Sequence, residues 1–301
     1  MAVLVTGASG YVGSRLTPQL LGDGHRVRGF VRDADKLESR DIEVAEGDAE
    51  TGEGLREAME GVDVVFFLIH AMDGGAEFGE TERQTAEHTV EAAQAHSVRR
   101  VVYLGGVLPE EDRSGGSEHL ESRREVEDLL LDGFPEAVAL RASMLIGAGS
   151  ASFDLLAGLV ERLPLLALPA WQDNRTAPID ERDAIEYLVR SATLDLAGDA
   201  RRTFDIGGPE EMTYGTMVER IAALAGRERP SVRLPVSATP VASRVAAATT
   251  GQEHALVEPL MRSLEYDLIP DTTAADAAFG LRPRGFDESV RWALAERGRG
   301  E

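Results

Sequence analysis

The chain has 301 residues, 43% of them hydrophobic, which is enough for one large domain or for a domain with a smaller partner. Its 53 acidic residues outnumber its 31 basic ones, so the formal net charge is −22. A surface this negative repels nucleic-acid phosphates and anionic lipid headgroups, and the lack of cysteine excludes disulfides and thiolate metal sites. We therefore expect no nucleic-acid partner and no membrane partner.

The N-terminal sequence has no basic region followed by an apolar stretch, as a secretory leader would. No apolar run reaches the roughly 18 residues that a membrane-spanning helix needs. Residues 2–5 are apolar but lead straight into a glycine turn. These features predict a cytoplasmic protein.

Short β-branched runs alternate with longer amphipathic stretches in the first half of the chain. We predict strands at 3–6, 26–31, 42–45, 62–68, 100–104 and 137–141, separated by helices at 10–21, 54–59, 80–96 and 117–131. In the stretch 80–96, Ala86, Val90 and Ala93 recur at the spacing of one helix face. Strands that are apolar throughout and separated by helices indicate a doubly wound α/β fold with a parallel sheet.

The rhythm loosens after Ser150. We predict helices at 179–193 and 213–225 and a strand at 202–206, while 155–171 is apolar and interrupted by prolines. From Pro230 onward an extended segment (231–236) precedes short helices. We therefore divide the chain into a dinucleotide-binding domain (1–150) and a smaller substrate-side lobe (151–301) that is partly interleaved with the first sheet through the strand at 202–206.

A glycine motif follows the first predicted strand. Gly7, Gly10 and Gly13 have the spacing Gly-x-x-Gly-x-x-Gly, and a helix begins within the motif. Such glycines allow a tight turn, a close approach of the backbone to a pyrophosphate, and close packing of the helix on the strand. The free N–H groups and the positive end of the helix dipole then hold the phosphates. The motif at this junction predicts dinucleotide binding in a Rossmann-type fold.

Further motifs occur in the order found in one superfamily. They are Phe30-Val31-Arg32-Asp33, Glu46-Gly47-Asp48, Tyr103-Leu104-Gly105-Gly106, His119-Leu120-Glu121-Ser122-Arg123 and Arg141-Ala142-Ser143-Met144-Leu145-Ile146-Gly147. With the glycine spacing, they resemble the atypical short-chain dehydrogenase/reductases, in particular the NmrA-like or YbjT-like NAD(P)H-binding proteins. The resemblance covers residues 1–225 well and the remaining tail loosely.

The end of the second strand bears on the choice of cofactor. Dinucleotide-binding folds place there an acid for the ribose 2′-hydroxyl of NAD or an arginine for the 2′-phosphate of NADP. Arg32 favours NADP, because a guanidinium binds phosphate through two hydrogen bonds, but the adjacent Asp33 could serve NAD. The resemblance implies that Asp48 contacts the adenine amino group, although Asp48 could instead cap a turn.

The predicted cofactor site gathers the glycine loop and the ends of the next strands. Leu68 and Ile69 are expected to form the wall beside the adenosine. The complete set is Gly7, Ser9, Gly10, Tyr11, Val12, Gly13, Arg32, Asp48, Ala49, Leu68, Ile69 and Gly105.

The usual catalytic pair of the superfamily is missing. Its dehydrogenases use Tyr-x-x-x-Lys, and at that place this chain has His119 and Arg123 with the same spacing. One interpretation makes Arg123 an exposed partner of Glu127. The other places His119, Arg123, Val126 and Leu130 on one inward helical stripe that brings the first two to the cofactor cleft as catalytic residues. No two histidines are three or four residues apart, so we expect no helical metal site.

These observations favour an NADP(H)-dependent oxidoreductase that transfers hydride to a small apolar carbonyl, enone or quinone. The alternatives are a non-catalytic NAD(P)-binding redox sensor and a nucleotide-sugar epimerase-like enzyme. We expect a small-molecule substrate, and the sequence does not specify an oligomeric state. Apolar residues after the sixth strand form a substrate wall or pack the two lobes together: Leu155, Leu156, Leu159, Leu163, Leu165, Leu166, Leu168 and Trp171.

Overall fold

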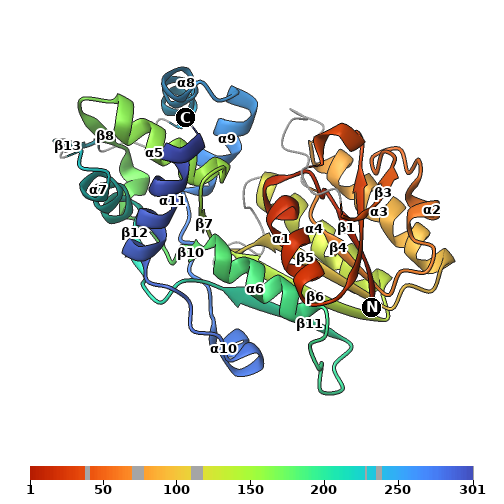
Figure 1. Cartoon of the computed structure of the whole chain (residues 1–301). Coiled ribbons are helices and arrows are strands. Elements are labelled where there is room, and N and C mark those ends of the chain that lie inside the picture. The colour runs from red at the N-terminus through yellow and green to blue at the C-terminus, as the bar shows by residue number, and fades with distance from the viewer. Residues whose placement is uncertain (38–40, 70–77, 110–117, 228, 235–238, 301) are drawn as a thin grey trace.

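The computed structural model describes residues 1–37, 41–69, 78–109, 118–227, 229–234 and 239–300 (Figure 1). Among these residues, seven strands form one parallel sheet with the order β11-β6-β5-β4-β1-β2-β3. The strands are β1 (Ala2–Thr6), β2 (Arg26–Val31), β3 (Glu43–Glu46), β4 (Val64–Phe67), β5 (Arg100–Gly106), β6 (Glu136–Ala142) and β11 (Arg201–Ile206). The chain builds β1 to β3 outward on one side and then returns to build β4 to β6 on the other. A ligand-binding crevice is expected at this reversal.

Helices cover both faces of the sheet, because successive residues of each strand point to opposite faces. Val3 and Val5 pack with residues of α1 (Tyr11–Gly22), α6 (Glu181–Ser191) and α10 (Thr273–Phe279). Leu4 lies in the core of the opposite face, with α2 (Leu55–Ala58), α3 (Phe78–Ala95) and α4 (Glu118–Gly133). The predicted Rossmann-type doubly wound fold is confirmed.

The second lobe lies beside the sheet and has its own apolar core (Figure 1). Its helices are α5 (Ala151–Arg162), α7 (Tyr214–Leu224), α8 (Thr239–Thr250), α9 (His254–Ser263) and α11 (Phe286–Gly300). Short strands pair in twos: β7 (Leu145–Ile146) with β10 (Ile179–Asp180), β9 (Arg175–Thr176) with β12 (Met212–Thr213), and β8 (Leu166–Leu168) with β13 (Ser231–Arg233). Two 3₁₀ turns complete the described elements, η1 (Ala34–Lys36) and η3 (Ala170–Asp173). No helix in the described ranges has the length and apolar character needed to cross a bilayer.

The structure corrects the sequence prediction in the second lobe. No helix was predicted in the apolar stretch 155–171, but its first part belongs to α5, which ends before Pro164. The apolar residues continue past the helix into β8 and so obscured the helical spacing. The extended segment predicted at 231–236 is a strand only as far as Arg233, and residues 235–238 lie outside the described residues. The last helix, α11, has 15 residues and is not short.

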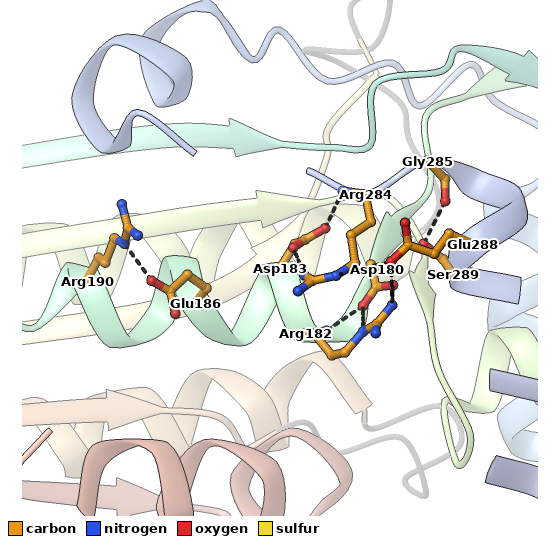
Figure 2. A network of polar contacts seen from close by, with 9 residues as sticks. All are labelled: Asp180, Arg182, Asp183, Glu186, Arg190, Arg284, Gly285, Glu288 and Ser289. Carbon is orange, nitrogen blue, oxygen red and sulfur yellow. Dashed lines mark hydrogen bonds and ion pairs between the residues drawn. The ribbon is translucent and has the colours of Figure 1, made fainter. Parts of the chain in front are cut away.

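Polar contacts join α6, which covers the sheet, to the second lobe (Figure 2). The buried carboxylate of Asp180 accepts hydrogen bonds from the backbone of Arg182 at 2.8 Å and from its guanidinium at 2.6 Å. Burial alone would raise the pKa of Asp180, but the bonds from Arg182 outweigh this effect and hold the pKa below its ordinary value. Asp183 binds the backbone and side chain of Arg284, and Arg182 also stacks on Trp292 of α11. These contacts connect the N-terminal end of α6 to the C-terminal part of the chain.

Candidate functional site

The glycine loop has the geometry that its sequence predicts. Gly7 has a φ of +68°, which a side chain would strain, and its carbonyl accepts a hydrogen bond from Gly10 at 2.9 Å. A Cβ on Gly13 would lie 2.3 Å from the Gly7 oxygen and 2.8 Å from the Cα of Ala8. Gly10 is the N-cap of α1, no side chain caps this helix, and its first turn has no acidic residue. The N–H groups at the start of α1 are therefore suited to an anion.

A cavity of about 420 Å³ opens at the carboxyl ends of β1, β2, β3 and β4. Eight residues of the predicted cofactor site line it: Gly7, Ser9, Gly10, Arg32, Asp48, Ala49, Leu68 and Ile69. Six further lining residues were not predicted from the sequence: Phe30, Val31, Gly47, Glu50, Thr81 and Thr85. Phe30, Val31, Gly47 and Glu50 are chain neighbours of predicted residues, so the strand ends already pointed to them. Thr81 and Thr85 come from α3, and their spacing of four residues was the only available signal.

Four predicted cofactor residues do not belong to the described lining, and their contacts are within the protein. The Tyr11 hydroxyl donates to Glu181 at 2.5 Å, and Val12 packs against the apolar core. Gly13 faces the Gly7–Ala8 backbone, and a Cβ on Gly105 would lie 2.7 Å from the Tyr103 ring. The contact of these four residues with a cofactor stays a prediction.

The contacts after β2 separate the two candidate cofactor determinants. Arg32 lines the cavity, whereas the carboxylate of Asp33 caps η1 by accepting a hydrogen bond from the backbone of Asp35 at 3.0 Å. Arg28 is bound to Glu43 at 2.9 Å and to two backbone carbonyls. Among the described lining residues, Arg32 is therefore the one positively charged side chain.

Asp48 caps a turn, as one of the two interpretations expects, and it also lines the cavity, while its contact with the adenine amino group stays a prediction. It lines the cavity, and its carboxylate accepts a hydrogen bond from the backbone of Glu50 at 2.9 Å. The turn therefore holds the carboxylate in a fixed orientation at the cavity wall.

Arg123 is buried inside the fold and does not lie on its surface. Its guanidinium pairs with Glu82 of α3 at 3.7 Å, and Glu82 also accepts a hydrogen bond from Ser122 at 2.7 Å. Because Arg123 is buried, the interpretation that makes it an exposed residue is wrong, and Glu127 binds Arg141 at 2.7 Å.

The helical stripe through Arg123 faces inward, as Val126 and Leu130 are also buried. Arg123 is not among the residues described as lining the cavity, although Thr81 and Thr85, beside its partner Glu82 on α3, are. Burial raises the pKa of the neighbouring Tyr103 to about 12, with Arg123 opposing the shift, so this phenol stays neutral at physiological pH. His119 belongs to α4, but its side chain lies outside the described residues.

Comparisons with known proteins agree with this geometry. A family described as NAD(P)H-binding matches residues 7–145. A ceramide reductase from Caulobacter vibrioides is 30% identical over 247 residues, which are 77% of this chain and 73% of that protein. A 3-beta-hydroxysteroid dehydrogenase from Mycolicibacterium neoaurum is 34% identical over 141 residues, 42% of this chain, and the match spans only 38% of that relative's length.

The fold is also shared with a solved structure. An NADPH-dependent quinone oxidoreductase from Escherichia coli, complexed with NADPH, has a TM-score of 0.74 at 20% identity and covers 96% of this chain and 98% of its own. At that identity the likeness shows the fold alone. The family match, the extent of the ceramide reductase match and the shared Rossmann fold lead to one conclusion. The chain belongs to the NAD(P)H-binding proteins of the short-chain dehydrogenase/reductase superfamily.

Proposed function

We propose that this protein is an NADP(H)-dependent oxidoreductase that transfers hydride to an apolar carbonyl, enone or quinone. The observation that carries the NADP assignment is the placement of Arg32 at the cavity while Asp33 caps the next turn. An acid that serves the 2′-hydroxyl of NAD must reach the ribose, and the carboxylate of Asp33 is instead bound to the backbone. The guanidinium of Arg32 suits a 2′-phosphate.

The residues present fit a nicotinamide dinucleotide along the whole loop. The uncapped N-terminus of α1 suits the pyrophosphate, and Leu68 and Ile69 supply an apolar wall for the adenosine half. When bound, the cofactor supplies or accepts the hydride. The relatives named for steroid, ceramide and quinone chemistry support an apolar acceptor.

We propose that His119 donates or accepts the proton that accompanies hydride transfer. A histidine can donate or accept a proton near neutral pH without a neighbouring lysine, which a tyrosine in this position needs. Arg123 is held by Glu82 about one helical turn from His119. It would act on the site by the electrostatic field of its charge, which favours negative charge on a reduced carbonyl oxygen.

A non-catalytic redox sensor is the second candidate. The ion pair between Arg123 and Glu82 favours it, because a buried pair of this kind can serve the packing of α3 on α4 and no chemistry at all. This candidate requires cofactor binding but no turnover.

The test begins with dissociation constants for NADPH and NADH, measured by cofactor fluorescence. We expect NADPH to bind about tenfold or more tightly, the scale of one charge-assisted phosphate contact. Arg32→Ala should remove this preference and leave NADH binding nearly unchanged. The matched control is Arg26→Ala, which removes a cation from the exposed beginning of the same strand, away from the cavity.

Equal affinity for both cofactors in the wild-type protein would contradict the NADP assignment. Turnover is then followed by the loss of NADPH absorbance with a panel of ketones, enones and quinones. Tight NADPH binding without oxidation of the cofactor by any acceptor would favour the sensor.

A further inference from the structure

A second cavity, of about 250 Å³, lies in the second lobe and shares no described lining residue with the first. All of its described lining residues are apolar. They come from α5, β8, η3, α7, α8, α9 and the end of β13: Leu156, Leu159, Leu163, Leu166, Ala167, Leu168, Pro169, Trp171, Val218, Leu234, Ala242, Val245, Ala246 and Met261. Six of the eight residues predicted to form a substrate wall are among them, whereas Leu155 is in the core and Leu165 is exposed.

Small residues alternate with large ones around the cavity. Ala167, Ala242 and Ala246 line the cavity between leucines, Met261 and Trp171. A water molecule inside would find no side-chain donor or acceptor among the described lining residues apart from the buried Trp171 nitrogen. Cavities of this kind favour hydrocarbon over water.

The surface around the cavity is apolar as well. Val245 and Leu234 line the cavity and are exposed, and Leu165 and Val232, on or beside the paired strands β8 and β13, are exposed too. Exposed apolar residues that gather at one place mark a site of interaction. A hydrocarbon therefore meets an apolar surface before it enters.

Helix α5 connects this cavity to the edge of the sheet. Gly149, just before the helix, lies so close to Tyr11 that a Cβ there would be 3.4 Å from its ring, which places the start of α5 beside the glycine loop. Leu156, the first residue of the helix that lines the cavity, is five residues beyond Ala151, so it lies about 7.5 Å further along the helix axis. A molecule that reaches both places must be elongated.

We propose that this cavity binds the hydrocarbon chain or fused-ring body of the substrate, which is then a lipid-like carbonyl compound. The lining residues alone indicate a hydrocarbon ligand. Only the identity of the bound molecule as the substrate rests on the proposed reductase function. The absence of charge from the described lining selects a neutral hydrocarbon, and the length of α5 excludes small ketones from reaching both sites.

The two tryptophans of the chain allow binding to be measured without turnover. Trp171 lines the cavity, and Trp292 stacks on Arg182 elsewhere, so Trp292→Phe leaves Trp171 as the single reporter. The probe is a long-chain methyl ketone with two bromine atoms in mid-chain, because bromine quenches indole fluorescence on contact. We expect saturable quenching by this probe and none by butanone.

A surface substitution then tests the location. Val245→Asp places a charge at the exposed mouth of the cavity and should raise the dissociation constant of the probe about tenfold, the equivalent of roughly two methylene groups no longer buried. Ala248→Asp puts the same charge on an exposed position of α8 that is not part of the described lining, and should have no effect. The KM for a long-chain ketone should be higher in Val245→Asp than in Ala248→Asp, whereas the KM for butanone should be the same in both variants.

The outcomes separate the two proposals. No quenching, or equal effects of Val245→Asp and Ala248→Asp, would overturn the cavity as the hydrocarbon site even if NADPH is oxidised. Quenching that Val245→Asp weakens, without oxidation of NADPH by any ketone, would support the cavity and overturn the reductase.

Discussion

The two cavities of this molecule are built in opposite ways. The first cavity takes its walls from the first 85 residues, where four strands end side by side, and its lining combines glycine backbone, hydroxyl and charged groups with an apolar wall. The apolar cavity takes its walls from segments spread between Leu156 and Met261, and its described lining has no charged side chain. Recognition of phosphate needs particular residues at particular spacings, whereas a hydrocarbon needs only space between apolar side chains. The first cavity therefore has a sequence motif and the second has none.

The two cavities also belong to separate apolar cores. The glycine loop rests on the cores of the sheet, and the second cavity is surrounded by the core of the second lobe. A substitution in one cavity should leave the other intact. The following predictions use this separation.

The largest effect is expected from Gly10→Val. A Cβ on Gly10 would already lie 3.1 Å from the Gly7 oxygen, and the branched side chain would project where the backbone must approach a pyrophosphate. We expect NADPH binding to be lost, a weakening of more than about 100-fold, while the fold survives. Quenching of Trp171 by the brominated ketone should be unchanged, because the second cavity does not depend on the loop.

The control for Gly10→Val is Gly22→Ala. Gly22 is the last residue of the same helix, it is exposed, and a Cβ there would meet nothing within 4 Å. This substitution should keep cofactor binding and raise the free energy of unfolding by up to about 1 kcal/mol. Retained NADPH binding in Gly10→Val would show that the loop is only a structural turn.

The same contrast explains what the sequence could predict. The strand at 26–31 was predicted to the residue, and eight cavity residues were identified, since strand ends and glycine spacing specify them locally. Thr81 and Thr85 were missed because a helix can pass over a cavity at any height, and only the packing of α3 determines which turn lines it. The prediction that Arg123 is exposed was wrong because it, too, depends on how two helices pack. Its partner Glu82 is 41 residues away in the chain, and the pair forms only when α3 packs on α4.

Substitution of His119 should lower kcat, whereas substitution of Arg123 should lower the free energy of unfolding. His119→Ala should lower kcat by roughly 10²- to 10⁴-fold with ketone substrates and keep both cofactor affinity and stability. Arg123→Met leaves the buried carboxylate of Glu82 without its cation, so the free energy of unfolding in urea should fall by about 3 kcal/mol. Quinones that need no immediate protonation should be least affected by the loss of His119.

The double variant Glu82→Gln/Arg123→Met is the control for Arg123→Met. It removes both charges together and should recover most of the stability that Arg123→Met loses. If the double variant is stable but its kcat stays low, the charge of Arg123 acts on the reaction. If its kcat recovers with stability, Arg123 serves only packing. Full activity of His119→Ala with every substrate would remove this histidine from the mechanism and leave protonation to solvent.

The smallest expected effect concerns the contact between α1 and the beginning of α6, the helix that polar contacts join to the second lobe. Glu181, at the beginning of α6, accepts a hydrogen bond from the Tyr11 hydroxyl at 2.5 Å and pairs with Arg15 at 2.8 Å, so it ties the first turns of α1 to α6. A Cβ on Gly147 would lie 2.1 Å from its carboxylate, which leaves the group buried with little room to move. Burial raises the pKa of Glu181 above its ordinary value near 4.5, and the contacts with Tyr11 and Arg15 only partly oppose the shift.

The raised pKa of Glu181 determines how the free energy of unfolding changes with pH. The folded protein holds the Glu181 proton more tightly than the unfolded chain does, so the contribution of this group is fully present below pH 4.5 and is lost as the pH rises through the folded pKa. Glu181→Gln should remove that decline, and its free energy of unfolding should therefore fall less steeply with pH than that of the wild type above pH 4.5. Urea unfolding at a series of pH values measures the difference, with Glu186→Gln, an exposed glutamate of the same helix, as the control for loss of one charge. Parallel curves for Glu181→Gln and the wild type would contradict the burial argument, and the contact would then hold α1 and α6 together without sensing pH.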